Sequence, residues 1–150
     1  MIVRSVVEGD LESVARVHWL SANTAYGRNE DFERRLRQTR DAFQLDYVRM
    51  LVAELDGEIV GLANVGTDEL YALYVHPDHW GSGAAQALID EAHVLLAESC
   101  DEARLTVLTA NPRARRFYER NGWQLTESVV EPHFGGEPTE VCRYRKDLSS

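Results

Sequence analysis

The sequence contains few cysteines and no long apolar run. Its two cysteines, Cys100 and Cys142, show no metal-type spacing, so we expect two reduced thiols in a cytoplasmic protein rather than a disulfide framework. No apolar run approaches the roughly 18 residues that a membrane span requires, and the first residues lack the basic and then apolar order of a signal peptide. The histidines are scattered without ligand spacing, which predicts that no metal is bound.

Basic residues are also scarce. The 150 residues include 16 Lys and Arg against 25 Asp and Glu, a formal net charge of −9. Such a surface repels phosphate backbones, so we expect no nucleic-acid partner, whereas an amine-bearing substrate is compatible with it. With 44% hydrophobic residues and no repeat or internal linker, the composition predicts one domain over residues 1–150 that buries a core without a metal or disulfide.

The hydrophobic pattern switches between strand and helix spacing along the chain. It predicts strands at residues 2–7, 48–55, 59–65, 69–75, 103–108, 123–129 and 139–145, and helices at residues 11–20, 31–43, 84–98 and 112–120. Residues 21–27 are polar and are expected to be irregular. The Asp56-Gly57 pair between two apolar runs predicts a type I′ hairpin, because this turn needs positive φ at both positions.

The order of these elements predicts the fold class. Residues 48–75 should form an antiparallel meander, in which Glu69, Tyr71, Leu73 and Val75 alternate onto one face. The strands on either side of the long helix should pair in parallel through a right-handed crossover. The sequence therefore predicts an α/β fold with a mixed, mostly antiparallel central sheet and helices on both faces.

The turn from the strand at 69–75 into the long helix is built from small residues. Gly81, Gly83, Ala84 and Ala85 would let a ligand approach the backbone closely, and the unpaired N–H groups of the first helical turn favour negative charge. A pyrophosphate would fit such a turn. A tight turn with small residues for packing explains the same glycines equally well. The absence of a following Lys-Ser/Thr pair or a third glycine excludes a P-loop and a dinucleotide-binding fingerprint.

Two motifs in this sequence resemble those of a known family. The run from Leu73 to Leu88, LYVHPDHWGSGAAQAL, resembles motif A of the GNAT superfamily of acetyl-CoA-dependent N-acetyltransferases, whose pattern is Arg/Gln-x-x-Gly-x-Gly/Ala after an apolar strand that ends in Val-x-Pro. Gly83 and Ala85 occupy the two small positions. Trp80 stands where the family usually has Arg or Gln, which removes a side-chain contact near the pyrophosphate and leaves the backbone donors.

The second motif is the run NPRARRFYERNGW from Asn111 to Trp123. It is similar to the family signature Asn-x-x-Ala-x-x-Phe-Tyr-x-x-x-Gly-Phe/Trp and matches every fixed position. The two motifs occur in the family's order, and the predicted order of elements extends the resemblance over the whole chain. The resemblance implies the GNAT fold with its splayed parallel strand pair, a single N-acetyltransferase domain, and acetyl-CoA (coenzyme A) as cofactor.

The resemblance also implies roles for individual residues. Tyr118 would protonate the departing thiolate, since a phenol with a pKa near ~10 and a thiol with a pKa near ~8.5 are reasonably matched. From spacing alone, Tyr118 could equally be a core aromatic, and Asn111 could equally cap the helix that starts at Pro112. The residues implied to hold the cofactor are Leu73, Tyr74, Val75, Trp80, Gly81, Ser82, Gly83, Ala84, Ala85, Asn111 and Tyr118.

The base and the acceptor pocket have looser candidates. Glu69, near the start of its strand, is the candidate base that deprotonates the attacking amine, or else an exposed charge beside a turn. By resemblance, the first-helix region lines the acceptor pocket with Trp19 and Tyr26 as candidate walls, although Trp19 would also suit the core. The fourth helix carries a basic patch, which is either a solvated face or a contact for the 3′-phosphate of coenzyme A: Arg113, Arg115, Arg116 and Arg120.

Three functions fit these residues. The first is an enzyme that transfers an acetyl group from acetyl-CoA to a primary amine of a small-molecule or peptide acceptor by direct attack in a ternary complex, and a homodimer is compatible with it. The second, suggested by Trp80, is a non-catalytic acyl-CoA-binding or sensor domain on the same fold. The third is a different α/β phosphate-binding protein in which Gly81-Ser82-Gly83 holds a nucleotide.

Overall fold

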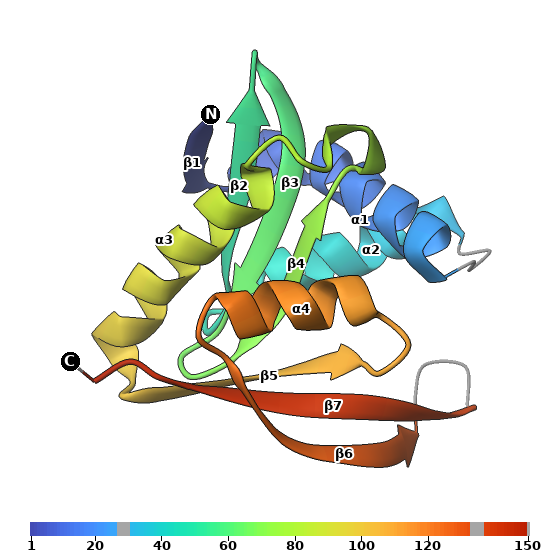
Figure 1. The fold of residues 1–150 in the computed structure, drawn as a ribbon. Helices are drawn as coiled ribbons and strands as arrows, with labels where there is room; N and C mark the ends of the chain where they lie inside the picture. Colours follow the sequence, from blue (N-terminus) through green and yellow to red (C-terminus); the bar gives the residue numbers. More distant parts are fainter. Residues whose placement is uncertain (27–30, 133–136, 150) are drawn as a thin grey trace.

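A computed structural model describes residues 1–26, 31–132 and 137–149, and the side chains of residues 25 and 26 lie outside this description. The elements follow the predicted order (Figure 1). The strands are β1 (Ile2–Ser5), β2 (Arg49–Leu55), β3 (Glu58–Val65), β4 (Leu70–Val75), β5 (Glu102–Leu108), β6 (Gln124–Pro132) and β7 (Pro138–Asp147). The helices are α1 (Leu11–Tyr26), α2 (Phe32–Phe43), α3 (Ala84–Ser99) and α4 (Pro112–Arg120), with short 3₁₀ helices at Glu8–Asp10 and Pro77–His79.

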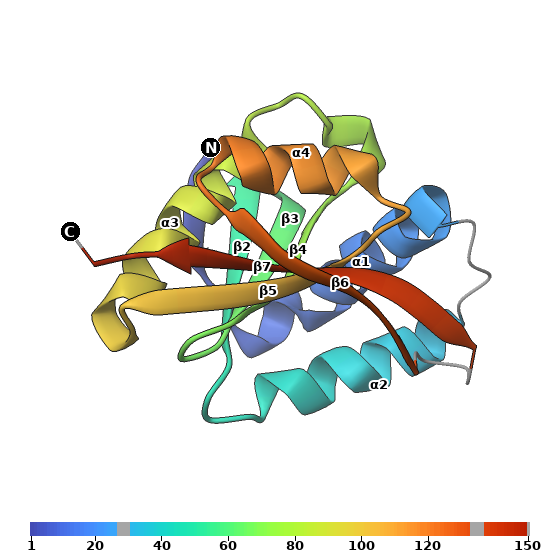
Figure 2. The same ribbon diagram turned by 60° about the horizontal axis from the view of Figure 1, so that its bottom comes forward.

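The strands form two antiparallel sheets instead of the single mixed sheet that the sequence predicts. The first sheet has the order β1-β2-β3-β4 and the second has the order β5-β7-β6. In the described part of the chain, β4 and β5 meet in parallel at one isolated bridge, Glu69 with Arg104, where the Arg104 N–H donates to the Asp68 carbonyl over 2.9 Å. Beyond this bridge the two strands diverge, as Figures 1 and 2 show from two sides. The predicted splayed parallel pair is therefore confirmed.

Helices cover both faces of the first sheet. α3 packs against β2, β3 and β4. α1 packs against β3 and β4, and α2 packs against α1. The β2–β3 turn has the predicted conformation, with φ of 53° at Asp56 and 82° at Gly57. The register shifts once between β2 and β3, at Ala53/Glu54, and once between β3 and β4, at Asn64/Val65. The antiparallel meander ends with β4, which leads through the β4–α3 turn to the start of α3.

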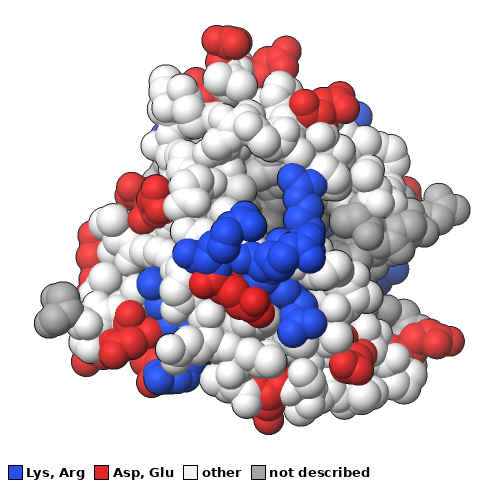
Figure 3. Space-filling view, in the orientation of Figure 1, with Lys and Arg blue, Asp and Glu red and all other residues white. Residues whose placement is uncertain are grey.

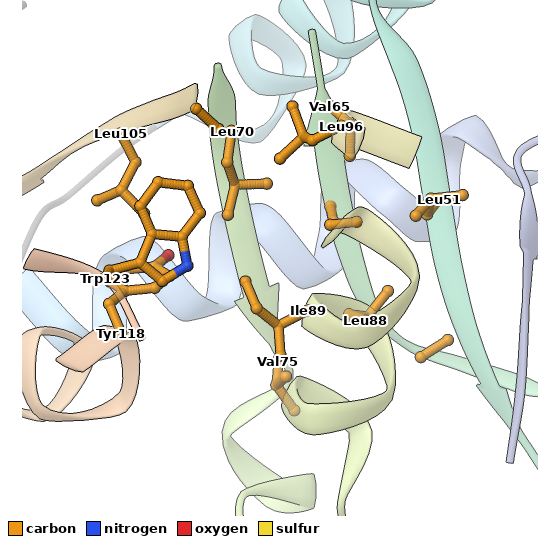
Figure 4. Packing of buried hydrophobic residues seen from close by; sticks show 14 of the residues in the cluster. Leu51, Val65, Leu70, Val75, Leu88, Ile89, Leu96, Leu105, Tyr118 and Trp123 are labelled. Atoms are coloured by element: carbon orange, nitrogen blue, oxygen red, sulfur yellow. The ribbon is translucent and has the colours of Figure 1, made fainter. Parts of the chain in front are cut away.

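One hydrophobic core joins the two sheets. Leu88 and Ile89 of α3 are fully buried and belong to the same cluster as Leu105 of β5 and Trp123, which precedes β6 (Figure 4). A smaller cluster lies under α1: Val14, Val17, Met50, Val52 and Leu62. Because apolar burial is the main favourable term in folding, this shared core compensates for the missing backbone pairing between β4 and β5.

A β-bulge changes which side chains of β4 share a face. Val65 pairs with Leu70 and Asn64 pairs with Ala72, so Tyr71 is an extra residue in β4. A bulge shifts the alternation by one position. Leu70 therefore joins Leu73 and Val75 in the core cluster, and the predicted alternation of Glu69, Tyr71, Leu73 and Val75 onto one face is wrong.

α1 extends further than its sequence pattern predicts. Residues 21–26 are helical, where the polar sequence predicts irregular chain. The Ser21 side chain is buried, and its hydroxyl donates to the Val75 carbonyl over 3.0 Å, so a polar residue here continues the buried stripe of Val14 and Val17. None of the described helices is both long enough and apolar enough to cross a membrane.

Candidate active site

The β4–α3 turn presents helical backbone donors to open space. Gly81 has φ 84° and Gly83 has φ 92°, left-handed values that suit glycine, and a Cβ built at either position meets no atom within 4 Å. Gly83 is the N-cap of α3 and supplies no capping side chain. The first N–H groups of a helix lack a carbonyl four residues back and lie at the positive end of the helix dipole. The turn can therefore accept an anionic group.

A cavity of about 460 Å³ lies where β4 ends and α4 faces the β4–α3 turn. This volume is in the range of small-molecule sites, which is roughly 300–1,000 Å³. Every residue predicted to hold the cofactor lines it except Ser82, whose hydroxyl instead accepts the Ala84 N–H over 3.3 Å. Both sequence motifs thus meet at one cavity. Its lining also includes residues that the motifs do not single out: Ser21, His79, Gln86, Arg113, Arg116 and Arg120.

Trp80 is fixed against the end of β4. Its indole N–H donates to the Val75 carbonyl over 3.0 Å, and its side chain is 42% exposed. The guanidinium carbon of Arg113, on α4, lies 3.9 Å from the centre of the Trp80 ring. Such a stack is a cation–π contact. It joins α4 to the β4–α3 turn beside the cavity.

Tyr118 and Asn111 each serve two purposes. Tyr118 is 8% exposed and packs between Phe117 and Trp123, at 5.6 and 6.3 Å between ring centres, yet it also lines the cavity. Asn111 accepts the Ala114 N–H over 3.1 Å, which confirms the N-cap interpretation, and it lines the cavity as well. The core and cap interpretations are therefore compatible with roles in binding.

The arginines of α4 divide into two groups. Arg113, Arg116 and Arg120 line the cavity, and Figure 3 shows a basic patch over α4 on this face. Arg115 instead donates to the Tyr144 hydroxyl over 3.1 Å, and that hydroxyl donates to Glu119 over 2.6 Å. Three of the four arginines are thus available to a ligand in the cavity.

Glu69 lies apart from this cavity. It lines a second cavity of about 410 Å³, together with Arg104, Thr106 and Arg143. Its carboxylate is 3.4 Å from the Arg104 Nε, and burial raises its pKa while Arg104 opposes the shift. Three residues lie between Glu69 and Leu73, so the two are four residue steps apart along the strand, a path of roughly 10–13 Å. The structure therefore does not bring Glu69 beside Tyr118.

The predicted acceptor residues on α1 line neither cavity with a described side chain. Trp19 packs edge-to-face against Phe32 of α2, with ring centres 5.6 Å apart, and the Tyr26 side chain lies outside the described residues. α1 reaches the site instead through Ser21, which lines the first cavity, and through His18, whose ring stacks on Tyr74 with ring centres 4.3 Å apart. Among the residues described, no three His, Cys, Asp or Glu side chains gather to hold a metal ion.

Sequence comparisons connect this geometry to a family. A family model described as an acetyltransferase (GNAT) domain matches residues 46–125. The chain is 32% identical over 138 residues to an acetyltransferase of Pectobacterium atrosepticum, covering 87% of this chain and 92% of that one. It is 36% identical over 105 residues to an acetyltransferase of Sodalis glossinidius, covering 67% and 69%.

Solved structures share the fold. A ribosomal-protein-alanine N-acetyltransferase from Brucella melitensis matches with a TM-score of 0.79 at 17% identity, covering 98% of this chain and 99% of that one. A structure from Salmonella typhimurium, solved with its cofactor acetyl-CoA, matches with a TM-score of 0.78 at 18% identity, covering all of this chain and 95% of that one. With both motifs meeting at one cavity and the family model covering residues 46–125, the chain belongs to the GNAT superfamily of acetyltransferases.

Proposed function

We propose that this protein transfers the acetyl group of acetyl-CoA to a primary amine by direct attack in a ternary complex. The observation that carries the proposal is the cavity of about 460 Å³ at the splayed end of β4, which both family motifs line. Its acetyl-CoA-bound structural relative from Salmonella typhimurium supports the choice of donor. When bound, acetyl-CoA supplies the thioester that the amine attacks.

The β4–α3 turn would hold the pyrophosphate. The N–H groups of Ser82 and Ala84 are bonded to the His79 carbonyl and to the Ser82 hydroxyl. The backbone N–H groups of Gly81, Gly83 and Ala85, at the start of α3, would donate to the pyrophosphate oxygens, and the dipole of this 16-residue helix would add to the attraction. The edge of β4 that faces the cavity would then carry the pantetheine arm inward, and a backbone N–H between Leu73 and Val75 would polarise the carbonyl under attack.

Tyr118 would act as the general acid. As the amine nitrogen bonds to the carbonyl carbon and the carbon–sulfur bond breaks, the phenol would give its proton to the departing sulfur. The burial of Tyr118 supports this role, since the surrounding rings exclude water and hold the phenol in one orientation.

Glu69 would accept the proton of the attacking amine, and the second cavity would admit the acceptor. The path of roughly 10–13 Å from Glu69 to Leu73 requires ordered water between the carboxylate and the amine. Burial raises the pKa of Glu69, so its carboxylate is a stronger base than an exposed one.

The pH dependence of kcat/KM tests the role of Glu69. The acidic limb should lie above the ordinary pKa of a glutamate, ~4.3, and Glu69→Gln should remove that limb and lower the rate by roughly 10-fold or more. Glu58→Gln, at an exposed position of β3, is the matched control. An unchanged pH profile in Glu69→Gln would exclude Glu69 as the base.

A second candidate is a non-catalytic acyl-CoA-binding domain, which Trp80 favours because it replaces the usual cationic or amide side chain. Two measurements separate the candidates: thermal unfolding with acetyl-CoA, and a screen of amines in which thiol release reports turnover.

Acetyl-CoA at about 100 times its Kd should stabilise the fold by about 2.7 kcal/mol, and at least one amine should release coenzyme A. Binding without turnover on any amine would support the sensor, and stabilisation by ATP or NAD alone would overturn both.

A further inference from the structure

The β4–α3 turn has Trp80 at the position where the family usually has Arg or Gln. The turn itself carries an acidic residue, Asp78, and the whole chain has a net charge of −9. A pyrophosphate carries two negative charges, so backbone donors alone would have to hold it against an unfavourable field. A cation from another element would remove this problem.

Arg113 is the cation that reaches this turn. It lies in the first turn of α4, and its guanidinium stacks at 3.9 Å on the Trp80 ring, while both side chains line the cavity with Gly81 and Gly83. The Trp80 ring cannot swing freely, because its N–H is bonded to the Val75 carbonyl. The guanidinium is therefore held in a defined place next to the backbone donors.

The stack leaves the guanidinium able to bind an anion. A guanidinium lying over an aromatic face keeps its N–H donors around its edge, in the geometry that suits bidentate phosphate recognition. Among the described residues, no carboxylate pairs with Arg113, in contrast to Arg104 and Arg143, which are each paired with two. Arg113 thus has charge and donors to offer at the cavity.

We propose that Arg113 supplies from α4 the pyrophosphate contact that position 80 lacks, with Trp80 as the positioning residue that holds the guanidinium by stacking. This inference rests on the proposed function, since it names the group of the coenzyme A donor that Arg113 binds. The two residues act as one unit: Arg113 touches the ligand, and Trp80 acts through Arg113.

Calorimetric titration with coenzyme A and with dephospho-coenzyme A, which lacks the 3′-phosphate, tests this assignment. Arg113→Ala should weaken both ligands equally, by roughly 10- to 100-fold, the range expected for a charge-assisted hydrogen bond. Trp80→Leu should weaken both by a smaller factor, and should have little further effect in the Arg113→Ala background. Returning a cation to the turn, as Trp80→Arg in that background, should restore most of the affinity.

Each other outcome has a definite meaning. Arg37→Ala, at an exposed position of α2, is the control for charge alone and should leave both affinities unchanged. A loss in Arg113→Ala for coenzyme A but not for dephospho-coenzyme A would place the guanidinium on the 3′-phosphate and overturn the proposal, as would native affinity in that variant. If the unmodified protein binds neither ligand, the proposed function itself fails.

Discussion

Tyr118 combines a packing role with the chemical role that we propose for it. Its ring is packed between Phe117 and Trp123, and its edge lines the cavity. Tyr118→Phe keeps the ring and removes only the hydroxyl, so coenzyme A should bind within about twofold of native affinity while turnover falls by roughly 10²-fold. Thiol release measures the rate, and Tyr71→Phe, on an exposed tyrosine, is the matched control. Undiminished turnover in Tyr118→Phe would remove the general acid from the mechanism.

His93 makes the stability of the fold depend on pH. Its Nε2 accepts the Trp123 indole N–H over 3.0 Å, which requires a neutral ring, and burial lowers its pKa to about 4. The unfolded chain would take up this proton near pH ~6.5, so the contribution is complete above that pH and is lost as the pH falls toward 4.

A pair of denaturation series tests this dependence. Between pH 7 and pH 5 the free energy of unfolding should drop by about 1 kcal/mol on account of this group, after allowance for its partial exposure. His93→Gln keeps an acceptor for the Trp123 indole but does not titrate, so its stability should change less over the same interval. Equal slopes for the two proteins would show that the His93 ring protonates equally in both states.

At the scale of single residues, the sequence identifies most of the residues that line the cavity. It does not predict the contacts between residues that are far apart in the chain. Gly83 and Tyr118 are predictable because fixed spacing in two motifs places them. The stack of Arg113 on Trp80 is not, since it depends on how α4 is held over the turn. Ser21 is missed for a different reason: a buried serine satisfied by the Val75 carbonyl is indistinguishable in sequence from a loop serine.

At the scale of elements, β3 and α3 lie close together at a glycine, Gly61. A Cβ at Gly61 would lie 2.9 Å from the Leu88 Cδ1 and 3.1 Å from the Tyr74 carbonyl oxygen. The backbone oxygen cannot yield as a side chain can, so Gly61→Ala should destabilise the fold by about 1–3 kcal/mol. Urea denaturation measures the loss. Gly9→Ala, where a Cβ meets nothing within 4 Å, should cost far less; equal losses would refute the packing argument.

Element boundaries follow the sequence where local chemistry sets them. α4 begins at Pro112 after an Asn cap and ends before Gly122 with φ 91°, as the pattern predicts. The bulge at Tyr71 has no local signal, because it arises from the register between β3 and β4. The same bulge explains why Leu70 lies on the core face with Leu73. It also explains why the candidate base, Glu69, does not share a face with Leu73 as the alternation predicts.

Across the whole molecule, the order of elements predicts the topology, whereas the separation of β4 from β5 is expected only through the resemblance to the GNAT fold. The two motifs and the crossover around α3 indicate that β4 and β5 are parallel neighbours. Whether such neighbours pair along their length depends on the twist of each sheet and on the side chains between them, which no local pattern encodes. The buried cluster that spans both sheets stabilises the separated strands, because Leu105 and Trp123 are buried in one cluster with residues of α3 and need no pairing of the strand edges.

In the part of the chain that the structure describes, the Glu69–Arg104 bridge is the one pairing between β4 and β5, and the facing edges of the two strands are otherwise unpaired, because β4 pairs on its other edge with β3 and β5 pairs on its other edge with β7. Deuterium should therefore enter the facing amides within seconds, while amides bonded inside either sheet resist it for far longer. Saturating coenzyme A should slow uptake along this seam alone. Mass spectrometry of peptic fragments measures this difference. Equal deuterium uptake with and without coenzyme A would show that the ligand does not bind between β4 and β5.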